Sequence, residues 1–339
     1  MKKLKFIDIY VITLLLACIS SAALRTYALF SDFNSVTMHF ENSIAIIAGN
    51  IVVAIANIAF ICYLFLGKKN EDLIAKTDNA ASYIPAGVVS TALLFMGVNL
   101  LGSLSKLPSG ILTTLAIIAA ILAFLSVGSF FFTIFIEKRD DQNKATFSLF
   151  IIAFLAMYSC YLYFNKMNHP TNSPSKVLDQ MAYLFSAAFF LYETRIALGR
   201  AKWRGYVSFG LIATLLCFYS SIPSLIVYAV NGYTVSDSLI ESVLTLCLAI
   251  FIGSKVLQTR NLTPNTECEM AKSIAALAMM REEEMEEARR ISHARDNNDK
   301  EENDEGNIEN YTFDIPYVET KTDFTPEDGD IDNGNHYQE

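Results

Sequence analysis

The stretch YETRIALGRAKWRGY, residues 192–206, is a basic turn between two apolar segments. The segment before it runs from Val177 to Tyr192, and the segment after it runs from Tyr206 to Val230. Short loops rich in Lys and Arg stay on the cytoplasmic side of a membrane. The turn therefore predicts that both segments cross a membrane and that the residues between them face the cytoplasm.

Apolar segments of this kind recur along the chain, each near the ~20 residues that a helix needs to cross the hydrocarbon core. Lipid offers no partners for open backbone groups, and the segments lack the alternation of a barrel, so helices are expected. The segment from Val177 is the weakest of them, since it is short and has Asp179 and Glu193 at its ends. The sequence predicts an all-α, polytopic membrane protein with eight transmembrane helices. They are expected at Phe6–Leu24, Ser43–Leu66, Tyr83–Leu104, Gly110–Ile136, Thr146–Phe164, Val177–Tyr192, Tyr206–Val230 and Ser236–Leu257.

The distribution of basic residues predicts the orientation. With the N-terminus inside, the cytoplasmic segments hold 15 Lys and Arg residues and the outer loops hold 4. This bias is the one seen in membrane proteins. It predicts that both termini are cytoplasmic. The compact loops, together with the lack of an organelle signal, favour the plasma membrane of a bacterium.

The charge of the chain is divided unevenly. The 339 residues are 53% hydrophobic with a net charge of −9, yet the segment from Asn261 onward has 22 acidic and 7 basic residues and carries −15. The residues before it carry +6. We therefore expect a transmembrane domain over residues 1–260 and an acidic cytoplasmic tail over 261–339, which argues against nucleic-acid binding. A capping box at Thr266 predicts a helix over about 266–295, and the polar composition predicts disorder over 296–339.

Ionisable side chains inside a membrane are costly and invite a functional hypothesis. Arg25 and Glu241 fall in the same outer layer of the predicted bundle. We expect Arg25 to pair with Glu241, or with Asp237 or Asp179, across helices. Two interpretations are open: a neutralised packing pair, or an outward-facing polar cavity.

The segment around Pro223 supports such a cavity weakly. Proline removes a helical hydrogen bond and crowds the preceding turn, so a kink is expected there. Serine hydroxyls beside it can satisfy the freed carbonyls or line a site. The candidate polar cavity comprises Arg25, Asp179, Glu241, Ser220 and Pro223.

The basic turn has its own candidate role. Its cations attract anionic lipid headgroups, and the opposite charges of the two parts of the chain also suggest docking of the acidic tail. Glu193 is expected to pair with one of the cations of the turn. The candidate lipid or tail contact comprises Arg195, Arg200, Lys202, Trp203 and Arg204.

One apolar island interrupts the acidic tail. An apolar, proline-containing octapeptide in a disordered segment is typical of a docking motif that adds a strand to a partner or fills a groove. We therefore expect a cytoplasmic protein partner. The candidate docking residues are Tyr311, Phe313, Ile315, Pro316 and Tyr317.

Motifs of catalysis and cofactor binding are missing from the sequence. It holds no GxSxG, HExxH, Walker or GxGxxG pattern, and its six Cys form no CxxC pair. We therefore expect no enzyme activity, no cofactor and no metal. The composition favours a non-enzymatic membrane scaffold or sensor that acts through its tail. A small-molecule transporter with an outward-facing polar cavity is the alternative.

Overall fold

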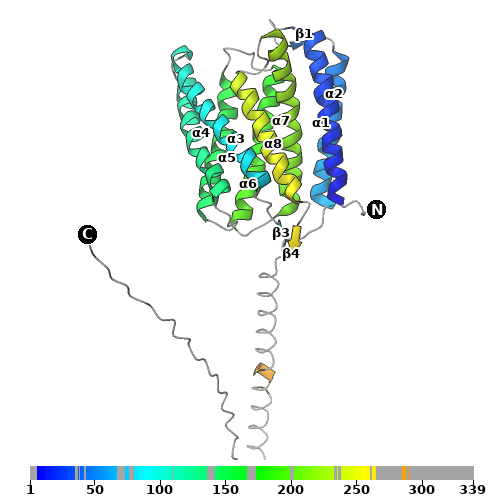
Figure 1. The fold of residues 1–339 in the computed structure, drawn as a ribbon, viewed down its shortest axis with the longest axis vertical. Coiled ribbons are helices and arrows are strands. Elements are labelled where there is room, and N and C mark those ends of the chain that lie inside the picture. Colours follow the sequence, from blue (N-terminus) through cyan, green and yellow to red (C-terminus); the bar gives the residue numbers. More distant parts are fainter. Residues whose placement is uncertain are drawn as a thin grey trace, which may run out of the picture. The chain divides into compact units, whose positions relative to one another are not determined.

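The computed structural model has a bundle of long helices as its main part (Figure 1). The helices are α1 Phe6–Ser31, α2 Ile44–Leu66, α3 Ala80–Ser103, α4 Ile111–Phe135, α5 Gln142–Phe164, α6 Pro174–Ala197, α7 Trp203–Asn231 and α8 Leu239–Gln258. The short elements are β1 Phe33–Asn34, β2 His39–Phe40, β3 Leu73–Ala75, the 3₁₀ turn η1 Leu104–Lys106 and β4 Leu262–Pro264. The structure describes residues 6–34, 37, 39–41, 43–66, 73–75, 80–108, 110–135, 142–165, 173–198, 202–232, 235, 238–259, 262–264, 285–287 and 290.

The helices pack mostly against their neighbours in the chain, as α1 does with α2 and as each helix from α3 to α8 does with the next. The most extensive contacts between distant parts of the sequence are those of α7 with α1 and α2 and of α3 with α8. α7 therefore lies between the α1–α2 pair and the remaining helices (Figure 1). Its burial fits this position, since most side chains from Gly205 to Ser224 are buried.

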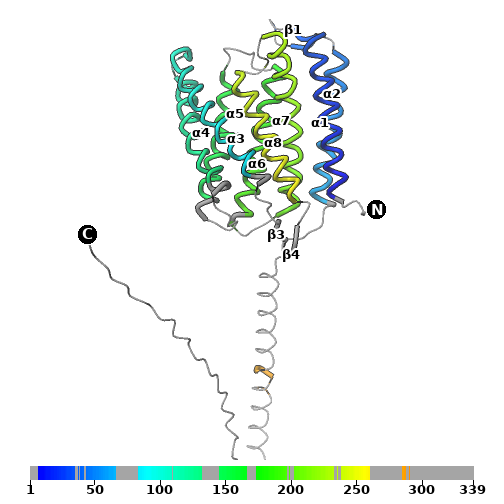
Figure 2. Tube along the Cα trace, viewed as in Figure 1, coloured from blue at the N-terminus to red at the C-terminus, as the bar shows by residue number. Residues whose placement is uncertain are grey.

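Two small antiparallel strand pairs mark the two ends of the bundle (Figure 1), whose helices Figure 2 shows as a trace of the chain. β1 pairs with β2 between α1 and α2, with Phe33 opposite Phe40. β3, which precedes α3, pairs with β4, which follows α8. We call these the β1–β2 end and the β3–β4 end. The second pair joins the loop between α2 and α3 to the chain that leaves α8.

The outer faces of the helices are apolar, as helices in contact with lipid require. α2 shows this most clearly, because its exposed side chains include Ile44, Ile47, Ile51, Ile55 and Ile58. Among the helices in the described ranges, seven are long and apolar enough to cross a membrane. α6 is the exception: it has 24 residues but is too polar to meet that criterion.

α6 is longer than the sequence predicted. We expected it over Val177–Tyr192, and it begins at Pro174 and ends at Ala197. Ser173 caps its first turn by accepting a hydrogen bond from the Lys176 N–H, and Pro174 stands at the first helical position, where a missing N–H costs nothing. The polar ends of this helix, which we assigned to loops, are parts of the helix itself.

α7 continues as a helix through Pro223 from Trp203 to Asn231. Ser221 Oγ donates to Cys217 O at 2.7 Å, and Ser224 Oγ donates to Ser220 O at 2.8 Å. Serines on both sides of the proline therefore donate to carbonyl oxygens one turn earlier, both of which precede Pro223 in the helix.

The chain forms two compact units, Met1–Lys272 and Ser273–Glu339. β4 belongs to the first unit, although the sequence assigned Asn261 onward to the tail. In the second unit, residues 285–287 and 290 are helical, and Glu286 pairs with Arg290 at 3.9 Å. The predicted disordered segment 296–339 lies outside the described residues, as does its docking island.

Candidate functional site

Arg25 lies inside the bundle near the β1–β2 end, with 2% of its surface exposed. Its Nη2 donates to Ser175 Oγ at 3.2 Å, and its guanidinium lies 5.0 Å from the centroid of the Tyr219 ring. Asp179 is close enough to act on it electrostatically. Arg25 on α1 therefore reaches both α6 and α7.

Asp179 of α6 is the carboxylate that interacts with the Arg25 guanidinium, and it too is 2% exposed. It lies one turn after Ser175 and thus on the same face of the helix. Ser220 Oγ of α7 donates a hydrogen bond to Asp179 Oδ1. Lys176 is buried on the same turn and donates from Nζ to the carbonyl oxygen of Asn165.

α8 brings the second carboxylate, since Glu241 in its first turn is fully buried. The N-cap residue Ser238 accepts a hydrogen bond from the Glu241 N–H, which fixes the start of the helix. One turn further, Thr245 Oγ1 donates to Glu241 O at 2.8 Å and lies 2.9 Å from the Tyr183 hydroxyl of α6. Tyr183 also interacts electrostatically with both Glu241 and Asp179.

α2 joins this arrangement through Asn50, whose Oδ1 accepts a hydrogen bond from the Tyr219 hydroxyl of α7 at 2.7 Å. Gly49 lies beside it, where an added Cβ would be 3.1 Å from the same hydroxyl oxygen. Buried polar groups from four helices, α1, α6, α7 and α8, thus meet near one end of the bundle, and the exposed Asn50 of α2 lies at their edge. We call these residues the polar cluster: Arg25, Asn50, Ser175, Lys176, Asp179, Tyr183, Tyr219, Ser220, Glu241 and Thr245.

The charges of the polar cluster balance: among its members, the cations are Arg25 and Lys176 and the acids are Asp179 and Glu241. Burial of an unbalanced charge is expensive, whereas a compensated set is tolerated. The structure thus brings Arg25, Asp179, Ser220 and Glu241 of the predicted cavity into one region. Pro223 lies one turn beyond Tyr219 on α7, and Asp237 lies outside the described residues.

Sequence reasoning missed several members of this cluster. Asn50 is an amide of the kind that hydrogen-bonds between membrane helices, and its tyrosine partner on α7 had no signal in the sequence. Tyr183 and Thr245 are a tyrosine and a threonine in apolar segments, where such residues are common. Only the rotation of α6 and α8 about their axes brings these two hydroxyls to 2.9 Å.

The other end of the bundle holds a second buried pair. Lys255 Nζ of α8 lies 3.9 Å from Glu193 Oε1 of α6, and both side chains are less than a tenth exposed. Glu193 therefore bonds to α8, whereas the sequence led us to expect a partner in the basic turn. Trp203 is buried and packs edge-on against Tyr206 at 5.6 Å. The indole that we assigned to the lipid contact thus lies inside the bundle.

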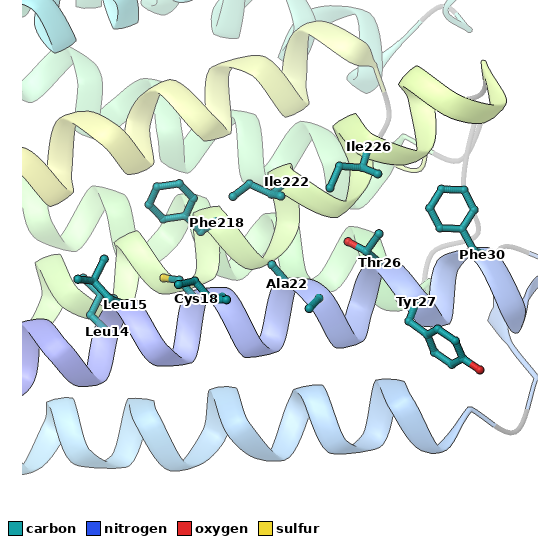
Figure 3. Close-up of a pocket in the computed structure, with 12 residues that line it drawn as sticks. Leu14, Leu15, Cys18, Ala22, Thr26, Tyr27, Phe30, Phe218, Ile222 and Ile226 are labelled. Atoms are coloured by element: carbon teal, nitrogen blue, oxygen red, sulfur yellow. The ribbon is translucent and has the colours of Figure 1, made fainter.

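An apolar cavity of about 730 Å³ lies between α1 and α7. Figure 3 shows Phe218, Ile222 and Ile226 of α7 facing α1, on which Cys18 and Ala22 line the opposite wall. Phe218, Ile222 and Ile226, which line the cavity, lie on a different face of α7 from Tyr219 and Ser220 of the polar cluster. The lining of the cavity is apolar and offers a ligand almost no polar group.

Comparison of the chain with protein-family models, with curated proteins and with solved structures finds no match. The class of protein therefore follows from the structure alone. Its apolar helices, long enough to span a bilayer and apolar on their outer faces, are those of a multi-pass membrane protein. In the described ranges, no group of three or more His, Cys, Asp or Glu side chains is arranged to hold a metal ion.

Proposed function

We propose that all helices from α1 to α8 cross the membrane and that both chain termini face the cytoplasm. α6 decides this count. Its acidic residues Asp179 and Glu193 are buried among other helices, while Leu184 and Leu191 are exposed on its outer face. Lipid would therefore meet an apolar surface, which removes the main cost of a polar spanning helix. The bias of Lys and Arg toward the β3–β4 end supports the same orientation. The proposed membrane is the plasma membrane of a bacterium, because the loops are compact and the sequence has no organelle signal.

Within this topology the protein is a non-enzymatic membrane sensor that acts through its cytoplasmic tail. One observation carries the proposal: α8 has Glu241 and Thr245 in the polar cluster at one end and Lys255 bonded to Glu193 at the other. β4 follows α8 and pairs with β3. A change in the cluster that shifts α8 would therefore reach the start of the tail.

Buried ion pairs suit this role better than they suit stability. Replacing such pairs by apolar residues is often neutral or stabilising, so their presence is weak evidence for a structural need. Switches use elements with two arrangements that a local change in charge or contact can bias. The polar cluster joins α1, α6 and α8 by charges and hydrogen bonds and is an element of this kind.

The tail is the proposed output. Its island at Tyr311, Phe313, Ile315, Pro316 and Tyr317 lies outside the described residues and remains a sequence prediction. A peptide of this composition binds by strand addition or by filling a groove. A cytoplasmic protein is thus the proposed partner, and the bilayer surrounds the bundle.

Capture of cross-linked partners by the full-length protein in membranes tests the sensor. We compare the wild type with three variants: Phe313→Ala in the island, Tyr183→Phe in the cluster, and Ile250→Val on the exposed face of α8 as a matched control. Phe313→Ala is expected to lose the partner, Tyr183→Phe to change the amount captured, and Ile250→Val to match the wild type. Equal capture by Phe313→Ala and the wild type would contradict a tail output, and equal capture by Tyr183→Phe would contradict the link through α8.

A transporter is the second candidate, favoured by the buried charges beside α7, which contains Pro223. Charged residues that face a bundle interior mark the pathways of many transporters. Proteoliposomes on a solid-supported membrane would be challenged with amino acids, organic anions and organic cations. A current that Arg25→Gln and Glu241→Gln abolish would support transport. A wild-type protein that gives no current with any of them would argue against it.

A further inference from the structure

The turn between α6 and α7 carries three cations at the β3–β4 end of the bundle. Arg195 lies in the last turn of α6, Lys202 is the N-cap residue of α7, and Arg204 follows in the first turn of α7. Lys202 is exposed, and the two arginines are half-buried. Arg200 belongs to the same turn but lies outside the described residues.

Close packing between the two helices places Arg195 of α6 beside the first turn of α7. The Arg195 guanidinium lies 5.9 Å from the centroid of the Tyr192 ring. That ring in turn lies directly against Gly205, where an added Cβ would be 2.2 Å from Tyr192 Cε1. Only glycine permits this approach. The Tyr192 ring therefore lies between the Arg195 guanidinium and the backbone of Gly205 at the start of α7.

The start of α7 adds hydrogen-bond donors to the same place. The first N–H groups of a helix have no partner within the helix, and the side chain of the N-cap residue Lys202 supplies none. Such open N–H groups and the helix dipole favour an anion. Trp203 is buried and fixes this turn against Tyr206, so the donors are held in position.

Glu193, the acidic residue nearest in sequence to the turn, forms an ion pair with Lys255 of α8 at 3.9 Å. In the part of the chain that the structure describes, Arg195, Lys202 and Arg204 have no carboxylate partner, and the Nε atom of Arg204 is buried without a hydrogen bond. The cations therefore keep their capacity to bind an anion.

We propose that Arg195, Lys202, Arg204 and the first N–H groups of α7 bind the phosphate group of an anionic phospholipid headgroup. α7 is a membrane-length helix that begins at Trp203, so the turn lies at the level of the headgroups. Arginine binds phosphate oxygens through paired N–H groups, and lysine adds a point charge. The lipid, rather than free phosphate, is favoured because its acyl chains remain in the adjacent bilayer while its phosphate reaches the turn. This inference does not depend on the proposed sensor.

Thermal unfolding of the full-length protein in detergent micelles, with added lipid, tests the proposal. The additives are phosphatidylglycerol, phosphatidylcholine and inorganic phosphate at equal concentration. The variants are the double substitution Lys202→Gln with Arg204→Gln, and Lys106→Gln, which removes an exposed cation near the β1–β2 end. Native mass spectrometry counts bound lipid in each case, so a binding result is available even where a variant unfolds early.

Phosphatidylglycerol is expected to raise the melting temperature of the wild type and of Lys106→Gln more than phosphatidylcholine does. At about fivefold in affinity for each basic residue near an anionic surface, the double variant should bind phosphatidylglycerol about 25-fold more weakly. Equal binding of phosphatidylglycerol by the double variant and the wild type would overturn the site. Equal stabilisation by inorganic phosphate would overturn the assignment to a lipid.

Discussion

Replacing Arg25 by glutamine tests whether the polar cluster is one connected unit. Arg25 and Asp179 are each 2% exposed, and Arg25 also donates to Ser175 at 3.2 Å. Arg25 and Asp179 interact electrostatically, and removing one of two buried opposite charges that pair directly costs about 3–5 kcal/mol, because the other charge stays buried without compensation. A hydrogen bond between membrane helices contributes only about 0.6 kcal/mol on average. We therefore expect Arg25→Gln to lower the free energy of unfolding by about 3 kcal/mol.

The assay is reversible unfolding in mixed micelles by titration with sodium dodecyl sulfate, applied to a double-mutant cycle. Its members are the wild type, Arg25→Gln, Asp179→Asn and the double variant. Groups in contact show coupling energies of about 0.5–3 kcal/mol, whereas distant sites are additive. The double variant should therefore be more stable than the sum of the two single losses implies.

Lys106→Gln provides the matched control, since Lys106 is an exposed cation near the same end of the bundle. Exposed charges contribute little to stability, so this variant should unfold like the wild type. If Arg25→Gln costs no more than Lys106→Gln, or if the two cluster substitutions are additive, the connected cluster is refuted.

Three further predictions concern contacts between α6 and its neighbours. Gly205→Ala should destabilise the fold by about 1–3 kcal/mol, because its Cβ would overlap the Tyr192 ring; combination with Tyr192→Leu should restore part of the loss in the same unfolding assay. Tyr183→Phe should cost about 0.6 to 2 kcal/mol through the lost hydrogen bond to α8, and no measurable loss would argue against that bond. Lys255→Met should be strongly destabilising, and adding Glu193→Gln should recover stability, since the pair is buried; a double variant weaker than Lys255→Met would contradict the pairing.

Much of the helical architecture follows from hydropathy, because a membrane admits few alternatives to the helix. The segment predicted at Gly110–Ile136 is α4, which begins at Ile111 and ends at Phe135. Hydropathy located α6 but placed its ends too close together, because Glu193 suggested that the helix ends there. That carboxylate is buried in the bundle against Lys255, so its polarity is met by protein and not by water.

The partners of the charged residues could not be predicted, since sequence spacing does not give the rotation of one helix against another. Arg25 was expected near Glu241, Asp237 or Asp179; it interacts electrostatically with Asp179, whereas its hydrogen bond to Ser175 and its contact with the Tyr219 ring were not predicted. A serine and a tyrosine carry no formal charge and gave no signal. Trp203 is likewise a residue type that commonly anchors a helix at the membrane interface, but it packs on Tyr206 inside the bundle.

Labelling of a single cysteine at position 202 in intact cells tests most directly whether α6 crosses the membrane. Lys202→Cys and Lys106→Cys are introduced separately into a chain without its native cysteines and exposed to a membrane-impermeant maleimide. If α6 crosses the membrane, position 106 is labelled, and position 202 is not labelled until the cells are permeabilised. Label at position 202 in intact cells would place the α6–α7 turn outside and contradict the eight-span topology.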